Sequence, residues 1–158
     1  MSPEQRRYLL LEQGIGAGVF NVALNAGIAW AMFRGLETVP LWGQQSIAGD
    51  TIGTAFMLPF LTTLIASRVV RGHVRRGRVA AMSWADGAAR FVPRRLSRRG
   101  ALLGIVCLVA VALPAAAALG ALGVERMSFG TFITFKALFA GVLATAVTPL
   151  VARAALAD

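Results

Sequence analysis

Seven polar side chains lie inside or beside stretches of the sequence that are otherwise apolar. They comprise two amides, one carboxylate, three hydroxyls and one ammonium: Asn21, Asn25, Asp50, Thr54, Thr62, Thr131 and Lys136. Moving a polar group out of water without a partner costs free energy, so each of these side chains needs a hydrogen bond, an opposite charge or a bound solute. In an apolar environment such groups are typical of polar contacts between helices or of a path for a solute or ion.

The two asparagines belong to a stripe of small and amide side chains. Gly14, Gly18, Asn21 and Asn25 follow one another at steps of four, three and four residues, which places them on one face of a helix. Small residues allow two helices to approach closely, so we expect this face to contact protein. Two uses of the amides remain open. We favour hydrogen bonds between helices over contact with a solute or ion.

Familiar catalytic and metal-binding motifs are absent from the sequence. It contains no HExxH, no paired-cysteine motif, no GKS or GKT phosphate loop and no GxSxG. With one histidine and one cysteine, the usual His-based triads and Cys-based metal centres are excluded. We therefore expect no enzymatic activity, no cofactor and no metal.

Four long apolar segments must position these polar side chains. Of all residues 57% are hydrophobic and 15% charged, whereas about a quarter of the residues in soluble domains are charged. A helix of about twenty residues crosses the roughly 30 Å hydrocarbon core of a bilayer. The sequence predicts an all-α polytopic membrane protein, a four-helix bundle in a single domain over residues 1–158. The predicted spans are at about 13–33, 47–67, 100–124 and 129–152.

The third predicted span carries small groups along one side. They recur at steps of three or four residues, at Gly104, Cys107, Val111, Pro114 and Ala118. This spacing predicts a face suited to tight contact with another helix.

The basic residues are concentrated between the second and third predicted spans. Ten of the sixteen lie in a loop at residues 68–99. Within this loop Ser83 and Asp86 resemble a helix cap, and Trp84 and Phe91 then fall on one face, which predicts a short amphipathic helix in the headgroup region. We expect anionic lipid or a partner to bind Arg75, Arg76, Arg78, Trp84, Arg90, Phe91, Arg94 and Arg95.

The distribution of arginine predicts the orientation of the chain. Four spans place both termini and the basic loop on one side, where thirteen arginines lie, and leave only Arg34 and Arg126 on the other. By the positive-inside rule the termini and the loop are cytoplasmic. The chain looks like a short, multi-span bacterial inner-membrane protein, and its motifs assign no named family.

This orientation places Asp50 and Lys136 in the same outer half of the bilayer. Lysine in hydrocarbon costs at least ~2.5 kcal/mol on insertion scales and can extend outward, toward the depth of Asp50. We predict an ion pair between Asp50 and Lys136, or a polar pocket shared with Thr54 and Thr131. The alternative is that Lys136 reaches the outer headgroups and Asp50 merely caps its helix.

Two classes of function fit this pattern. The first, which we slightly favour, is a transport or channel subunit for a small solute or ion. Four helices leave little room for a pore, so it requires a homo-oligomer or a partner membrane chain. The second is a non-transporting scaffold or accessory protein that recruits lipid or a partner through its arginine-rich loop. Nucleic-acid binding is not expected.

Overall fold

Four helical rods make up most of the computed structural model, which describes residues 2–82, 93 and 95–157. The first rod consists of α1 (Pro3–Arg7), the π-helix η1 (Tyr8–Gly16) and α2 (Ala17–Phe33), the second of α3 (Ile47–Arg75), the third of α4 (Leu96–Cys107), η4 (Leu108–Ala112) and α5 (Leu113–Ala121), and the fourth of α6 (Phe129–Leu156). Each rod is long and apolar enough to cross a membrane. This confirms the prediction of a mostly helical chain with four helices of membrane-spanning length.

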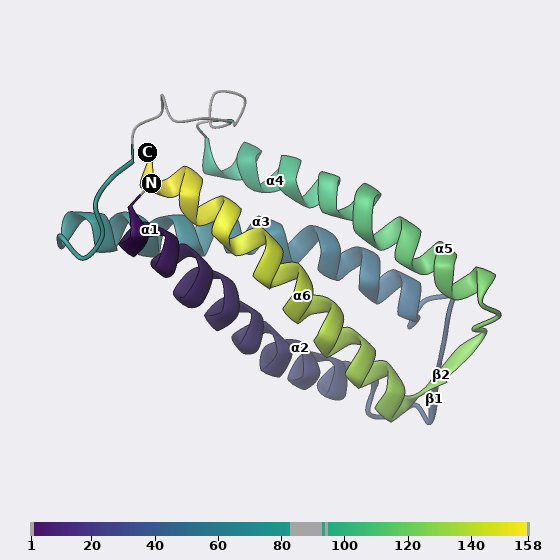
Figure 1. Cartoon of the computed structure of the whole chain (residues 1–158). Coiled ribbons are helices and arrows are strands. Elements are labelled where there is room, and N and C mark those ends of the chain that lie inside the picture. The colour runs from purple at the N-terminus through teal and green to yellow at the C-terminus, as the bar shows by residue number, and fades with distance from the viewer. Residues whose placement is uncertain (1, 83–92, 94, 158) are drawn as a thin grey trace.

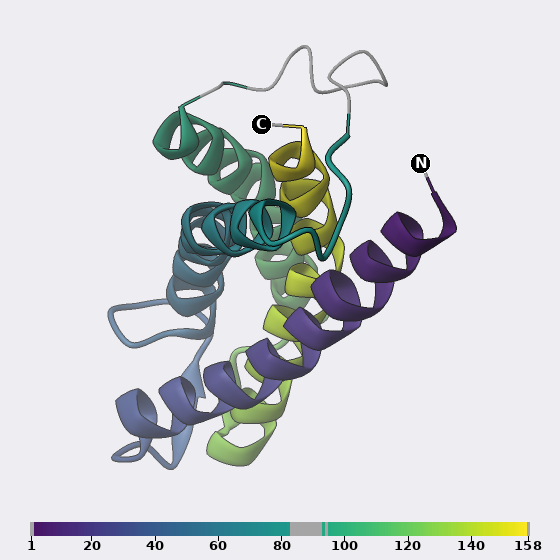
Figure 2. The ribbon, with the colours of Figure 1, turned by 90° about the vertical axis from the view of Figure 1, so that its left-hand side faces the viewer.

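Helix α6 lies at the centre of the arrangement. It lies between α2 and α3, and α4 packs against α3 (Figures 1 and 2). In α6, 56% of the residues in its most apolar stretch are buried, against 33% or less in the corresponding stretch of each of the other three rods. Both ends of the described chain lie at one end of the bundle, together with the end of α3 and the start of α4 (Figure 1). We call this the basic end, and the end with the strands the strand end.

The contact between the first rod and α6 depends on glycine. A methyl group on Gly18 would overlap the hydroxyl of Thr145, and one on Gly141 would overlap the side chain of Val22. The two backbones can approach this closely only because both positions lack a side chain. Gly14, Gly18 and Asn25 are buried, so this face of the first rod contacts protein as predicted.

The third rod contains a π-helical turn that shifts its buried face. Its buried small residues are Gly100, Gly104, Cys107, Ala112 and Ala116. The step from Cys107 to Ala112 is five residues because hydrogen bonds in η4 span five residues, as from the Leu113 N–H to the Leu108 carbonyl. A stripe extended at steps of three and four therefore loses register. The prediction was wrong for Val111, Pro114 and Ala118, which are exposed.

Two short strands close the bundle at the end opposite the termini. Strand β1 (Thr38–Pro40) pairs antiparallel with β2 (Arg126–Ser128), Val39 opposite Met127. Val39 is fully buried and packs in a cluster with Phe33, Ile47 and Phe132. The segment after the first rod is thereby joined to the segment before α6, a link that the sequence did not predict.

The basic loop is shorter than predicted because α3 continues past its apolar part. It ends at Arg75, where Gly77 adopts φ +68°, the Gly77 N–H donates to the Val74 carbonyl and the Arg78 N–H donates to the His73 carbonyl. This is the Schellman arrangement that terminates helices at glycine. The first rod likewise begins at Pro3 rather than near residue 13, and α4 begins at Leu96 rather than at Gly100. The predicted amphipathic helix lies outside the described residues.

Candidate functional site: a buried ion pair

A buried ion pair within the bundle joins α3 to α6. Lys136 Nζ donates to Asp50 Oδ1 across 86 residues of sequence. The side chains of Lys136 and Asp50 are only 4% and 8% exposed. The predicted ion pair is therefore present, and Lys136 does not extend to the surface as the alternative required.

Capping residues and strands place the two charges at the same level. Ser46 caps α3, since its Oγ accepts from the Gly49 N–H at 3.1 Å, and Asp50 follows in the first turn. Asp50 is therefore not the cap itself. Ser128 caps α6, so Lys136 lies two turns further along. Both helices run in the same direction from the strand end (Figure 1). Helix α6 follows β2 directly, whereas residues 41–46 separate β1 from α3, so the first turn of α3 lies level with a position two turns into α6.

Burial of this ion pair has a small effect on net stability but makes the loss of either partner costly. Removing two charges from water costs hydration free energy, and their mutual attraction roughly offsets that cost when the geometry is good. The pair therefore adds little net stability relative to two apolar side chains. Removing one partner is different, because it leaves the other charge buried and uncompensated. What the arrangement does reliably is fix α3 against α6.

The two asparagines hydrogen-bond to their own helix. The Asn21 side-chain amide donates to the Ala17 carbonyl at 2.9 Å, and that of Asn25 donates to the Asn21 carbonyl at 3.1 Å. Asn25 is buried and Asn21 is half-buried. Both amide groups therefore donate within the first rod, whereas the sequence analysis favours bonds between helices.

The predicted threonines differ in exposure. Thr54 and Thr62 are half-buried, and Thr131 is exposed, where its N–H donates to the capping Ser128 Oγ. Sequence reasoning gave less weight to Thr63 and Thr145, which donate to the Pro59 and Gly141 carbonyls four residues earlier. A threonine four residues after a proline or a closely packed glycine in a predicted helix is the sequence signal for such a bond.

The basic end exposes most of its described arginines, although Arg99 is buried and Arg71 is half-buried. Of the residues predicted to bind lipid or a partner, Arg75, Arg76, Arg78 and Arg95 are exposed, and Trp84, Arg90, Phe91 and Arg94 lie outside the described residues. Other exposed arginines at this end are Arg6, Arg7, Arg98 and Arg153. The side chains of Arg34 and Arg126 lie at the strand end.

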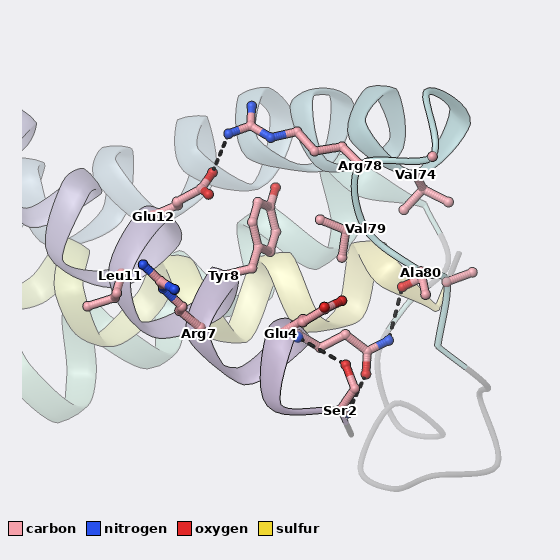
Figure 3. Close-up of a pocket in the computed structure, with 13 residues that line it drawn as sticks. Ser2, Glu4, Arg7, Tyr8, Leu11, Glu12, Val74, Arg78, Val79 and Ala80 are labelled. Atoms are coloured by element: carbon pink, nitrogen blue, oxygen red, sulfur yellow. Dashed lines mark hydrogen bonds and ion pairs between the residues drawn. The ribbon is translucent and has the colours of Figure 1, made fainter.

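A groove at the basic end was not foreseen. It lies between the α1–η1 segment and residues 74–81, has a volume of about 780 Å³, and is called the amino-terminal groove here (Figure 3). Tyr8 forms one wall and is only 5% exposed; its hydroxyl hydrogen-bonds to His73 Nδ1 at 2.9 Å. Arg78 and Glu12 form an ion pair at 3.2 Å across its rim. The sequence predicts that the first span begins near residue 13, so it does not predict a groove formed by the residues before it.

Comparison with known protein families, with curated proteins and with solved structures found no match. The class is therefore defined by the fold itself. Four helices of membrane-spanning length around a buried ion pair fit a multi-pass membrane protein.

Proposed function

We propose that the chain is a bacterial inner-membrane protein that works as a non-transporting scaffold, with its basic end in contact with anionic lipid at the cytoplasmic face. The observation that supports this is how the polar groups within the bundle are used. Asp50 and Lys136 neutralise each other, and the amides of Asn21 and Asn25 donate to their own helix. A solute path needs polar groups that are open to a ligand. Most of the exposed arginines of the described chain lie instead at the basic end.

Lipid contact is tested by neutralising arginines at one end of the bundle. Arg75→Gln with Arg76→Gln removes two exposed charges from the basic end, and Arg34→Gln with Arg126→Gln removes two from the strand end. Each surface cation contributes about 1 kcal/mol of attraction to an anionic leaflet, so the first pair is expected to reduce bound phosphatidylglycerol several-fold. Spin-labelled phosphatidylglycerol measures this. Equal loss in both double variants would contradict the proposal.

Orientation is tested by labelling single cysteines. In a Cys107→Ala background, cysteines at Gln44 and at Arg76 are expected to react with an impermeant maleimide from opposite faces of the membrane. Both positions are exposed and lie at opposite ends of the bundle. Labelling of both from the same face would refute the four-span arrangement.

A transport or channel subunit is the second candidate, supported by the buried ion pair. Charged groups inside a membrane domain commonly belong to ion or proton pathways. On this proposal the chain works as a homo-oligomer or with a partner chain. Proton or potassium flux in proteoliposomes is then expected to disappear in Asp50→Asn and Lys136→Met, while absence of flux in the wild type supports the scaffold.

A further inference from the structure

The amino-terminal groove differs in charge from the rest of the basic end. Two carboxylates, Glu4 and Glu12, and two guanidinium groups, Arg7 and Arg78, lie around it. The surrounding surface exposes arginines without such a balance. A ligand that carries one positive and one negative charge matches the groove, whereas a purely anionic ligand would also meet two carboxylates.

The walls of the groove are held in place by contacts between distant segments. Gln5 Nε2 donates to the Ala80 carbonyl at 3.0 Å (Figure 3). The Met82 N–H donates to the Leu156 carbonyl at 2.8 Å, which ties the 79–82 segment to α6. The groove is therefore largely formed before a ligand arrives, as is usual for sites of about 300–1,000 Å³.

The π-helix contributes Tyr8 and Glu12 to this wall. Hydrogen bonds in η1 span five residues, and the Gln13 side chain donates to the Tyr8 hydroxyl, five residues earlier, at 3.1 Å. With His73 as its other partner, the Tyr8 hydroxyl already has two hydrogen-bond partners. Tyr8 thus forms a wall, and the groups left for a ligand are the charges at the rim.

We propose that the amino-terminal groove binds the headgroup of a phospholipid that carries a phosphate and a primary ammonium, a phosphatidylethanolamine. This inference rests on the proposed function, which places the basic end at headgroup level. The phosphate binds the guanidinium group of Arg78 and the ammonium donates to Glu12, so that each exchanges the other for the ligand, and the charges of Arg7 and Glu4 lie further along the groove. Val74, Val79 and Leu11 offer apolar contact for the adjoining methylenes.

A primary ammonium suits the groove better than a quaternary one. It donates three hydrogen bonds, which carboxylates accept, whereas choline has no N–H to donate and is recognised by cages of aromatic rings. Only one aromatic side chain of the first rod, Tyr8, lines the groove, beside carboxylates. We therefore expect selection of phosphatidylethanolamine over both phosphatidylcholine and phosphatidylglycerol.

Native mass spectrometry of the delipidated full-length protein, with the three lipids at equal concentration, tests this selection. One exposed ammonium–carboxylate contact corresponds to about a three- to fivefold preference for phosphatidylethanolamine. Glu4→Gln with Glu12→Gln is expected to abolish that preference and to raise retention of phosphatidylglycerol, because Arg7 and Arg78 then meet no carboxylate. Arg78→Gln is expected to lower retention of all three lipids, and the control Arg98→Gln, on α4 outside the groove, to change none of the ratios.

Two results would overturn the proposal: equal retention of the three lipids by the wild type, or a preference that survives in the double glutamine variant. A second measurement needs no variant. Soluble phosphoethanolamine is expected to displace bound phosphatidylethanolamine from the wild type at lower concentration than inorganic phosphate does, and equal displacement would refute the ammonium site. Loss of headgroup selection with intact phosphatidylglycerol binding at Arg75 and Arg76 would reject the groove alone and leave the proposed function standing.

Discussion

The bundle contains two described ion pairs that are chemically alike and physically opposite. Lys136–Asp50 joins two helices with side chains 4% and 8% exposed, whereas Arg78–Glu12 crosses the rim of a groove with side chains 58% and 48% exposed. In a low dielectric a lone charge is costly, and in water it is hydrated at once. The first pair can therefore determine which helices meet, and the second remains available to exchange its partner for a ligand.

The largest expected effect comes from breaking the buried pair. Lys136→Met is expected to destabilise the fold by about 3–5 kcal/mol, because Asp50 then stays buried without a cation. The double variant with Asp50→Leu is expected to recover most of this loss, since neither charge remains. Unfolding by SDS in mixed micelles, followed by circular dichroism, measures both. A double variant as unstable as the single one would show that the pair is not the cause.

A smaller effect is expected from the glycine contact between the first rod and α6. Gly18→Ala is expected to cost about 1–3 kcal/mol, because its methyl group overlaps Thr145 and forces the helices apart. Gly27→Ala is the matched control on the same helix, since nothing lies within 4 Å of its added Cβ. It is expected to be neutral or to stabilise by up to about 1 kcal/mol through helix propensity. Equal effects in the same unfolding assay would refute the close approach.

The smallest effect is expected from the exposed pair. Glu12→Gln is expected to change the free energy of unfolding by less than about 1 kcal/mol, and less still as salt rises. The same assay at low and high salt measures this. A loss as large as that of Lys136→Met would mean that the pair is structural, and the contrast between the two ends would no longer hold.

The ion pair was predictable from sequence because membrane geometry leaves few choices. Once four spans and an orientation are inferred, Asp50 and Lys136 fall at similar depth, and each is costly without the other. The face of Gly14, Gly18 and Asn25 was predictable for a similar reason, since a helical period determines which residues lie together.

Other features depend on contacts that no local pattern records. The two strands satisfy their backbone groups by pairing with a segment far away in sequence, and a segment as short as Thr38–Pro40 carries no alternation to detect. The π-helical turn before Leu113 lies in an apolar run that fits an α-helix equally well. The end of α3 is a different case. Gly77 after a run of basic residues is a recognised stop signal for helices, so the end of α3 was predictable from the sequence. The amino-terminal groove was missed because helix η1 brings polar residues of a presumed tail against the end of α3.

The central position of α6 has a consequence for biogenesis. On the ribosome Asp50 is made 86 residues before Lys136, and α2 and α3 are complete before the helix that packs against both exists. A nascent chain that stops short of α6 therefore carries a carboxylate without its cation and two rods without their common neighbour. Such fragments leave the faces of α2 and α3 that α6 would cover exposed, and the cell's membrane proteases are expected to remove them while the finished chain survives.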